Sequence, residues 1–284
     1  MATLYLVSTP IGNLGDLSPR AADTLESVTR ILAEDTRRTL TLLSHLKLKT
    51  PLVSLHAHNE ASRRETVLEW LASGEDLALV SDAGTPLVSD PGQRIVEAAV
   101  EAGFPVVPIP GPSAVLAALA GSGFPGDRFS FLGFLPRKGP ERVELLDRIS
   151  SSPETVVLFE SPERTRALLA ALVESCGSDR LVAVGRELTK LYEEFVRGTL
   201  TQVKEHFEIH APRGEIVVVV SGEPEPGDPG PVDEGAARAL AKALLDEGLT
   251  PSRVAKEVAR RLKSPRNLTY AVVQRLSEDQ KGSE

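Results

Sequence analysis

Cysteine is almost missing from this sequence, because Cys176 is the only one among 284 residues. A single cysteine cannot form a disulfide within the chain or build a cysteine-ligated metal site, and its rarity favours a cytoplasmic location. Apolar runs of about 18 residues, the length that spans a membrane, are also absent. The opening segment MATLYLVSTP lacks a basic stretch followed by a long apolar one, so we expect no signal peptide.

Histidine clusters with metal-ligand spacing are missing as well. Among the five histidines only His56 and His58 come near such a spacing, and on a strand they would share a face. Nearby strand histidines are usually structural or contact substrate, so no metal is expected.

Positive charge is in deficit, with a formal net charge of −8. This argues against a general nucleic-acid coat protein but does not exclude RNA binding through local basic patches. The candidate patches are Arg37 with Arg38, Arg63 with Arg64, the set Arg137, Lys138 and Arg142, and the set Arg260, Arg261, Lys263 and Arg266.

What the chain does contain is an ordinary globular composition, 41% hydrophobic and 25% charged, in a length that fits about two domains and an appendage. The central stretch is LALVSDAGTPLVSDPG, residues 77–92. It reads as a buried strand, a sharp Gly-Pro turn and a helix start at Gln93, which is where open α/β sheets bind ligands. A capped strand–helix turn without a ligand is an equally good interpretation of these residues alone.

The first part of the chain repeats a strand–loop–helix pattern about five times. The predicted strands cover residues 3–9, 30–33, 52–55, 77–80 and 106–109. This pattern predicts a mostly parallel sheet covered by helices on both faces. The loops IGNLGD, AEDTRR, HAHNE, SDAGTP and PGPS would then converge at one edge of the sheet and form a site.

The fold class expected for the whole chain is α/β, with two α/β domains and a small helical segment after them. The predicted boundaries are 1–121 for the first domain, 122–222 for the second, 223–232 for a Pro/Gly-rich linker, and 233–284 for a segment resembling a helix-turn-helix. A three-helix cap that binds no nucleic acid is an equal alternative for that last segment.

Nine ordered motifs resemble one family. They are LYLVSTPIGNLGDLSPRA, AEDTRRT, HAHNE, ALVSDAGTPLVSDPG, PIPGPSA, FSFLGFLPRKG, LFESPERT, GRELTKLYEE and RGEIVVVVSG. The chain resembles the tetrapyrrole methylase superfamily and, within it, the branch that acts on ribosomal RNA. The resemblance implies a cleft between two α/β domains that binds S-adenosyl-L-methionine, and 2′-O-methylation of a cytidine in the decoding region of 16S ribosomal RNA. It also implies a homodimer.

The resemblance carries cofactor contacts onto two groups of residues. They are Asp82, Gly84, Thr85, Pro86, Leu87, Ser113 and Ala114 from the first domain, and Phe159, Glu160, Ser161, Glu215 and Ile216 from the second. The porphyrin-methylating relatives have Gly-Asp-Pro where this chain has Gly84-Thr85-Pro86, and this difference favours an RNA substrate. The alternatives are a tetrapyrrole (porphyrin or corrin precursor) methyltransferase and a non-catalytic RNA-binding factor of the same fold.

Methyl transfer to a ribose hydroxyl needs a group that accepts its proton. The candidate pairs are His58 with Glu60 and Glu187 with Lys190, and the sequence does not choose between them. The cations expected to meet RNA phosphates are Arg37, Arg63, Lys138, Arg186, Arg260 and Arg261.

Overall fold

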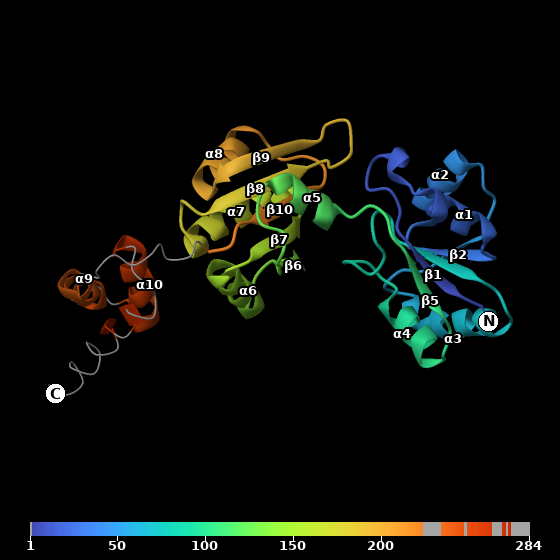
Figure 1. Cartoon of the computed structure of the whole chain (residues 1–284), viewed down its shortest axis with the longest axis horizontal. Helices are drawn as coiled ribbons and strands as arrows, with labels where there is room; N and C mark the ends of the chain where they lie inside the picture. Colours follow the sequence, from blue (N-terminus) through green and yellow to red (C-terminus); the bar gives the residue numbers. More distant parts are fainter. Residues whose placement is uncertain (1, 224–233, 247–248, 263–268, 271, 274–284) are drawn as a thin grey trace. The chain divides into compact units, whose positions relative to one another are not determined.

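The computed structural model describes residues 2–223, 234–246, 249–262, 269–270 and 272–273. It divides into two compact units, Met1–Gly222 and Glu223–Glu284 (Figure 1). None of the helices that it describes is long and apolar enough to cross a membrane.

The first unit contains two five-stranded sheets. The elements of the first sheet and its helices are β1 (Leu4–Val7), η1 (Leu14–Asp16), α1 (Pro19–Ser27), β2 (Arg30–Ala33), α2 (Thr36–Leu46), β3 (Leu52–Ser54), α3 (Glu60–Ala72), β4 (Leu77–Val80), α4 (Gln93–Glu101) and β5 (Val106–Ile109). The strand order is β3-β2-β4-β1-β5, and all of its pairs are parallel. The predicted parallel sheet is therefore confirmed.

Helices cover both faces of this sheet, as the repeated strand–helix pattern predicts. One apolar cluster joins α1 and α2 to the face that carries Val7 and Val80, and a second joins α3 and α4 to the face that carries Leu4 and Leu79. Figure 1 shows the two helix pairs on opposite sides of the strands. Strand β4 is buried at all four positions because it lies in the middle of the sheet with helices on both sides.

The second sheet is mixed, which agrees with the expected antiparallel pairing. Its elements are α5 (Ala114–Ser122), β6 (Phe129–Phe134), α6 (Pro140–Ser151), β7 (Thr155–Glu160), α7 (Pro162–Cys176), β8 (Leu181–Arg186), β9 (Glu194–Thr199), α8 (Leu200–Ile209) and β10 (Ile216–Val220). In the order β6-β7-β10-β8-β9 only β6 and β7 are parallel.

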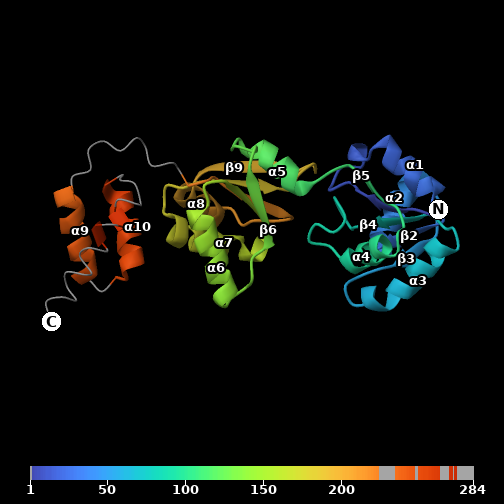
Figure 2. The ribbon, with the colours of Figure 1, turned by 60° about the horizontal axis from the view of Figure 1, so that its bottom comes forward.

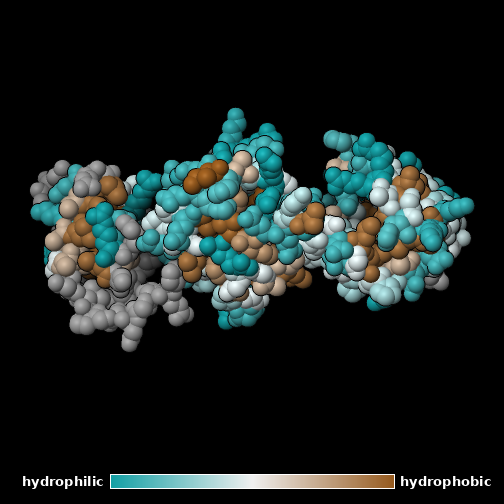
Figure 3. All heavy atoms as spheres, turned by 90° about the horizontal axis from the view of Figure 1, so that it is seen from above, coloured by the Kyte–Doolittle hydropathy of each residue, from teal (hydrophilic) through white to brown (hydrophobic). Residues whose placement is uncertain are grey.

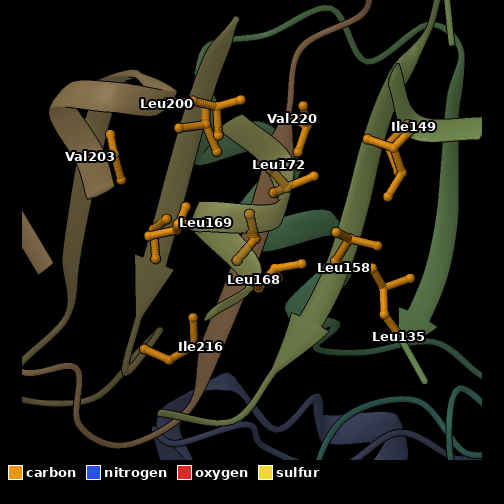
Figure 4. Close-up of a cluster of buried hydrophobic side chains, with 14 of the residues drawn as sticks. Leu135, Ile149, Leu158, Leu168, Leu169, Leu172, Leu200, Val203, Ile216 and Val220 are labelled. Atoms are coloured by element: carbon orange, nitrogen blue, oxygen red, sulfur yellow. The ribbon is translucent and has the colours of Figure 1, made fainter. Parts of the chain in front are cut away.

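The core of the second sheet lies between its strands and α6, α7 and α8. Leucines of α7 such as Leu168 and Leu169 pack against Leu158 and Val218, as Figure 4 illustrates for several of these side chains. The opposite face is covered by α5, which contacts β7, β8, β9 and β10. Helix α5 thus packs on the second sheet, although the predicted division at residue 121 assigns most of it to the first domain.

The second unit contains α9 (Glu234–Asp246) and α10 (Pro251–Leu262), which Figure 2 shows running alongside each other. Ala237, Ala241 and Leu244 of α9 pack against Val254 and Val258 of α10. The predicted linker over 223–232 lies outside the described residues except for Glu223, and most of the chain after Leu262 lies outside them too.

Candidate functional site

The polar loops of the first sheet lie at the same edge, because all five strands run in one direction. Strand β4 has β1 on one side and β2 on the other. The helix that follows β4 packs on one face, whereas the helices that follow β1 and β2 pack on the other. Ligands of open α/β sheets bind where connections diverge in this way. The candidate site therefore centres on the loop after β4, residues 81–92.

The loop after β4 is tied to the loop after β1 by two backbone hydrogen bonds. Thr9 N donates to Gly84 O at 2.9 Å, and Gly84 N donates to Thr9 O at 3.0 Å. Gly84 has φ of +83°, a conformation that glycine adopts without strain. A Cβ at this position would lie 3.3 Å from Ile11 Cγ2. The backbone conformation therefore favours glycine here, and a larger residue would also require Ile11 to shift slightly.

The same loop is connected to the loop after β5. The hydroxyl of Thr85 donates to Pro112 O at 3.3 Å, and Ser8 Oγ donates to Thr85 Oγ1 at the same distance. Next to Pro112, Ser113 caps α5, since its Oγ accepts from Leu116 N at 3.4 Å. The predicted cofactor residues Gly84, Thr85 and Ser113 are thus brought together by hydrogen-bonded loops.

Two residues of the loop after β4 have an uncommon backbone conformation. Leu87 has φ of +72° and Ser89 has φ of +67°, in the left-handed region that side chains other than glycine rarely adopt. Such conformations cost about 1–3 kcal/mol each and concentrate at functional sites. Pro86 is buried between these residues and the Gly84 turn, whereas Leu87 is half-buried and packs against the α3–α4 side of the sheet.

A group of carboxylates lies where the loops after β2 and β4 meet. Asp82 Oδ1 accepts from Asp35 N at 2.8 Å, and Asp82 Oδ2 lies 3.6 Å from Arg38 Nε. Hydrogen bonds from Arg37 lower the pKa of Asp35 to about 2. Burial, reinforced by the charge of Glu34, raises the pKa of Asp90 to about 6. Burial also raises the pKa of Glu34, with the charge of Asp82 adding to the effect.

The two residues of the predicted pair differ in burial, because Glu60 is buried and His58 is exposed. Glu60 is buried, and its Oε1 accepts from Arg94 N at 2.7 Å, which ties the start of α3 to the start of α4. His58 is exposed and packs edge-on against His56, with ring centroids 5.9 Å apart. His56 Nδ1 is buried and has no hydrogen-bond partner within the described residues. His56 is not among the predicted site residues, although its alternation with His58 is visible in the sequence.

The predicted residues at the end of β7 point to opposite faces of the strand. Phe159 of β7 packs on Phe131 of β6, with ring centroids 4.8 Å apart. Figure 1 shows β6 and β7 in the second sheet. Glu160 is 3% exposed, and its Oε1 accepts from Ser161 N at 2.8 Å and lies 3.2 Å from Arg164 Nε. Glu160 Oε2 has no partner within the described residues. Glu160 therefore holds the start of α7 while Phe159 faces the other side.

The second predicted pair forms a connected ionic network. Lys190 Nζ lies 2.8 Å from Glu187 Oε1 and 3.1 Å from Glu215 Oε2. Hydrogen bonds from Lys190 and from the backbone of Glu215 lower the pKa of Glu187. Burial acts to lower the pKa of Lys190, but its hydrogen bonds to both glutamates outweigh burial and raise it. In this arrangement both partners stay charged at neutral pH, and neither readily exchanges a proton. The neighbouring Ile216 is buried at the start of β10.

The β1 loop also reaches the turn that carries Lys190. A Cβ at Gly12 would clash with Lys190 Cγ and would lie 2.8 Å from Thr189 Oγ1, so only glycine allows the approach. Ile11 and Leu188 share an apolar cluster that also contains Ala114 and Phe159. Two predicted cofactor contacts, Ala114 from the first predicted domain and Phe159 from the second, thus belong to the same apolar cluster.

The cations predicted to contact RNA have mixed environments. Arg37 pairs with Asp35, Arg186 with Glu194, and Arg261 with Glu257. Lys138 is exposed in the loop after β6, and Arg63 is half-buried on α3. The side chain of Arg260 lies outside the described residues.

Comparison with known proteins identifies relatives along nearly the whole chain. The family described as Tetrapyrrole (Corrin/Porphyrin) Methylases matches residues 3–204. A protein of Synechocystis sp. named "Ribosomal RNA small subunit methyltransferase I" is 44% identical over 279 residues, which cover 98% of this chain and 100% of that protein. A Thermotoga maritima protein of the same name is 48% identical over 223 residues, which cover 78% of this chain and 100% of that protein.

Solved structures show the same fold at low sequence identity. A cobalt precorrin-4 methyltransferase is 18% identical with a TM-score of 0.59, over 77% of this chain and 94% of that one. A uroporphyrin-III C-methyltransferase from Thermus thermophilus, complexed with S-adenosyl homocysteine, is 20% identical with a TM-score of 0.55, over 77% and 97% of the two chains.

Proposed function

Because the chain belongs to the tetrapyrrole methylase family, we propose that it is an S-adenosyl-L-methionine-dependent methyltransferase of small-subunit ribosomal RNA. The observation that carries this proposal is the 44% identity to a ribosomal RNA methyltransferase over 98% of the chain. In finer detail, we propose that it methylates the 2′-oxygen of a cytidine in the decoding region of 16S ribosomal RNA. Its cytoplasmic location and homodimeric state stay predictions.

The residues at the candidate site fit this cofactor. S-Adenosyl-L-methionine supplies a methyl group on a sulfonium and presents both an amino-acid end and an adenine. The Thr85 hydroxyl and the start of α5 at Ser113 provide polar groups, and Phe159 provides an aromatic surface. Gly84 and Gly12 keep the surrounding backbone segments close together.

The chain has to align the ribose hydroxyl with the methyl donor and remove the hydroxyl proton. A proton acceptor needs a free lone pair near neutral pH. Lys190 and Glu187 are paired and charged, and Glu60 already accepts from Arg94. His58 is exposed and forms no hydrogen bond within the described residues. We therefore rank His58 above the Glu187–Lys190 pair as the acceptor.

The test of the reaction is mass spectrometry of ribosomal RNA from cells that lack this protein, before and after the pure enzyme and S-adenosyl-L-methionine are added. Loss and recovery of one 2′-O-methylcytidine is the expected result. Unmethylated RNA, both as isolated molecules and in assembled subunits, contradicts the proposal. Methylation of a porphyrin precursor in the same assay would instead support the tetrapyrrole alternative.

The test of the acceptor compares His58→Ala with His45→Ala, an exposed histidine on α2. Loss of a general base typically costs about 10²–10⁴-fold in rate. We expect that loss in kcat for His58→Ala only, with unchanged cofactor affinity. Wild-type kcat for His58→Ala would remove His58 from the reaction.

A further inference from the structure

Two large apolar side chains stand next to each other in the turn between β8 and β9. Leu191 is 89% exposed and Tyr192 is 68% exposed. Most of the visible face in Figure 3 is hydrophilic, with hydrophobic residues in smaller patches. A leucine and a tyrosine exposed side by side contribute nothing to the core, and they form a small apolar surface that a ligand could contact.

The turn that presents them is held in one conformation. Lys190 N donates to Glu187 O at 2.9 Å, and Glu193 N donates to Lys190 O at 3.1 Å. Thr189 N donates to Glu193 Oε2 at 2.6 Å. Glu187 and Thr189 have φ of +51° and +65°, which only a firmly held turn maintains. The backbone of the turn therefore needs little further ordering when a ligand binds.

The turn also lies beside the candidate site. Its residues Thr189 and Lys190 are those that Gly12 of the β1 loop approaches, and Leu188 joins the apolar cluster that contains Phe159. A group bound at Tyr192 is thus placed next to the loops that end the strands of the first sheet.

The charges around the tip are mixed. The carboxylate of Glu194 pairs with Arg186, whereas that of Glu193 accepts from Thr189 N and keeps its negative charge. Arg213 is exposed and makes no ion pair within the described residues. It precedes Gly214, which packs so tightly on Glu187 that a Cβ there would clash. A cation that could meet a phosphate therefore lies next to the residue that packs on Glu187, where the turn that carries Tyr192 begins.

We infer that Tyr192 stacks on an unpaired base of the RNA substrate, next to the nucleotide that is methylated, and that Leu191 extends this platform. Aromatic side chains are the usual surfaces on which proteins hold splayed RNA bases. This inference rests on the proposed function. A second copy of the chain fits less well. The surface area of two side chains on a turn is far smaller than the roughly 800 Å² that each partner buries in a stable interface.

The experiment measures kcat/KM for assembled small subunits with the full-length chain and methyl-labelled S-adenosyl-L-methionine. The variants are Tyr192→Ala, Tyr192→Phe and the control Ile209→Ala, which removes another exposed apolar side chain, 78% exposed at the end of α8. Base stacking corresponds to a loss of about 5- to 150-fold for Tyr192→Ala. We expect that loss through KM, with unchanged cofactor affinity and near-wild-type values for the other two variants.

Wild-type kcat/KM for Tyr192→Ala would overturn the inference, as would an equal loss for Tyr192→Phe, which keeps the ring. Dissociation of a dimer by Tyr192→Ala would assign the surface to a second copy instead. If the wild-type chain itself methylates no subunit RNA, the proposed function fails, and that outcome is separate from the behaviour of the variants.

Discussion

At the scale of single residues, Gly84 links backbone conformation to the site. Its φ of +83° favours glycine, and an added Cβ would lie in tight contact, 3.3 Å from Ile11 Cγ2. The sequence motif predicted a sharp turn at the ligand-binding end of a strand. The structure adds that the backbone of Gly84 is hydrogen-bonded to Thr9 in the loop after the neighbouring strand.

We predict that Gly84→Ala weakens S-adenosyl-L-methionine binding, because the loop must shift to accommodate the methyl group. The matched control is Gly74→Ala, where φ is +92° but nothing lies within 4 Å of the added Cβ. Both changes should lower the free energy of unfolding by about 1 kcal/mol through backbone strain. Calorimetric titration should show weaker binding for Gly84→Ala alone, and equal affinities would refute the loop assignment.

Asp90 gives a prediction about pH. Burial and the nearby charge of Glu34 raise its pKa from the ordinary 3.8 to about 6 in the folded chain. Between these values the folded state binds more protons than the unfolded state, so the free energy of unfolding falls as pH rises from about 4 to about 6. Above that range the ionised carboxylate remains a destabilising group.

Asp90→Asn should therefore raise the melting temperature at pH 8 and flatten its fall between about pH 4 and 6. Exposure of part of the side chain keeps the expected gain on the order of 1 kcal/mol. Thermal melts of both proteins across that range measure it. The prediction is wrong if the two curves stay parallel.

At the scale of elements, the turn between β8 and β9 depends on Lys190. Its ammonium stands between Glu187 and Glu215, and its raised pKa keeps it charged. The predicted pair Glu187–Lys190 thus forms an ionic connection that also includes Glu215.

We predict that Lys190→Arg retains most activity, because arginine keeps the positive charge between the two glutamates. Lys190→Gln should lower the free energy of unfolding by about 1 kcal/mol, since it leaves two carboxylates facing each other. Chemical denaturation and initial rates measure the two effects. A loss of about 10²-fold or more in kcat for Lys190→Arg would instead mark Lys190 as the proton acceptor.

At the scale of the whole molecule, the boundary between the two compact units lies after Gly222. The Thermotoga maritima relative is matched over its full length by 223 residues of this chain, a span about as long as the first unit. The first unit also contains both sheets and all predicted cofactor contacts.

We predict that a chain ending at Gly222 folds and binds S-adenosyl-L-methionine with unchanged affinity. Calorimetric titration and a thermal melt of the truncated protein test this directly. If the helices α9 and α10 serve RNA binding, only KM for the small subunit should rise. An unfolded truncated chain would show instead that the second unit is needed for stability.

The sequence by itself determined the parallel sheet, its doubly covered architecture and the loops at the edge where the candidate site lies. Alternating apolar runs and Gly-Pro turns are local signals, and parallel strands necessarily bring their carboxyl ends to one edge. The loop SDAGTP can therefore be placed at that edge from the order of residues alone.

Only the tertiary structure decided what individual side chains do there. Glu60 and Lys190 look equivalent as candidates in the sequence, yet one holds the start of α4 and the other bridges two glutamates. The packing of α5 on the second sheet and the burial that raises the pKa of Asp90 depend equally on distant segments. The hydrogen-bond partners and the burial of a side chain come from residues far apart in the chain, so no local sequence pattern encodes them.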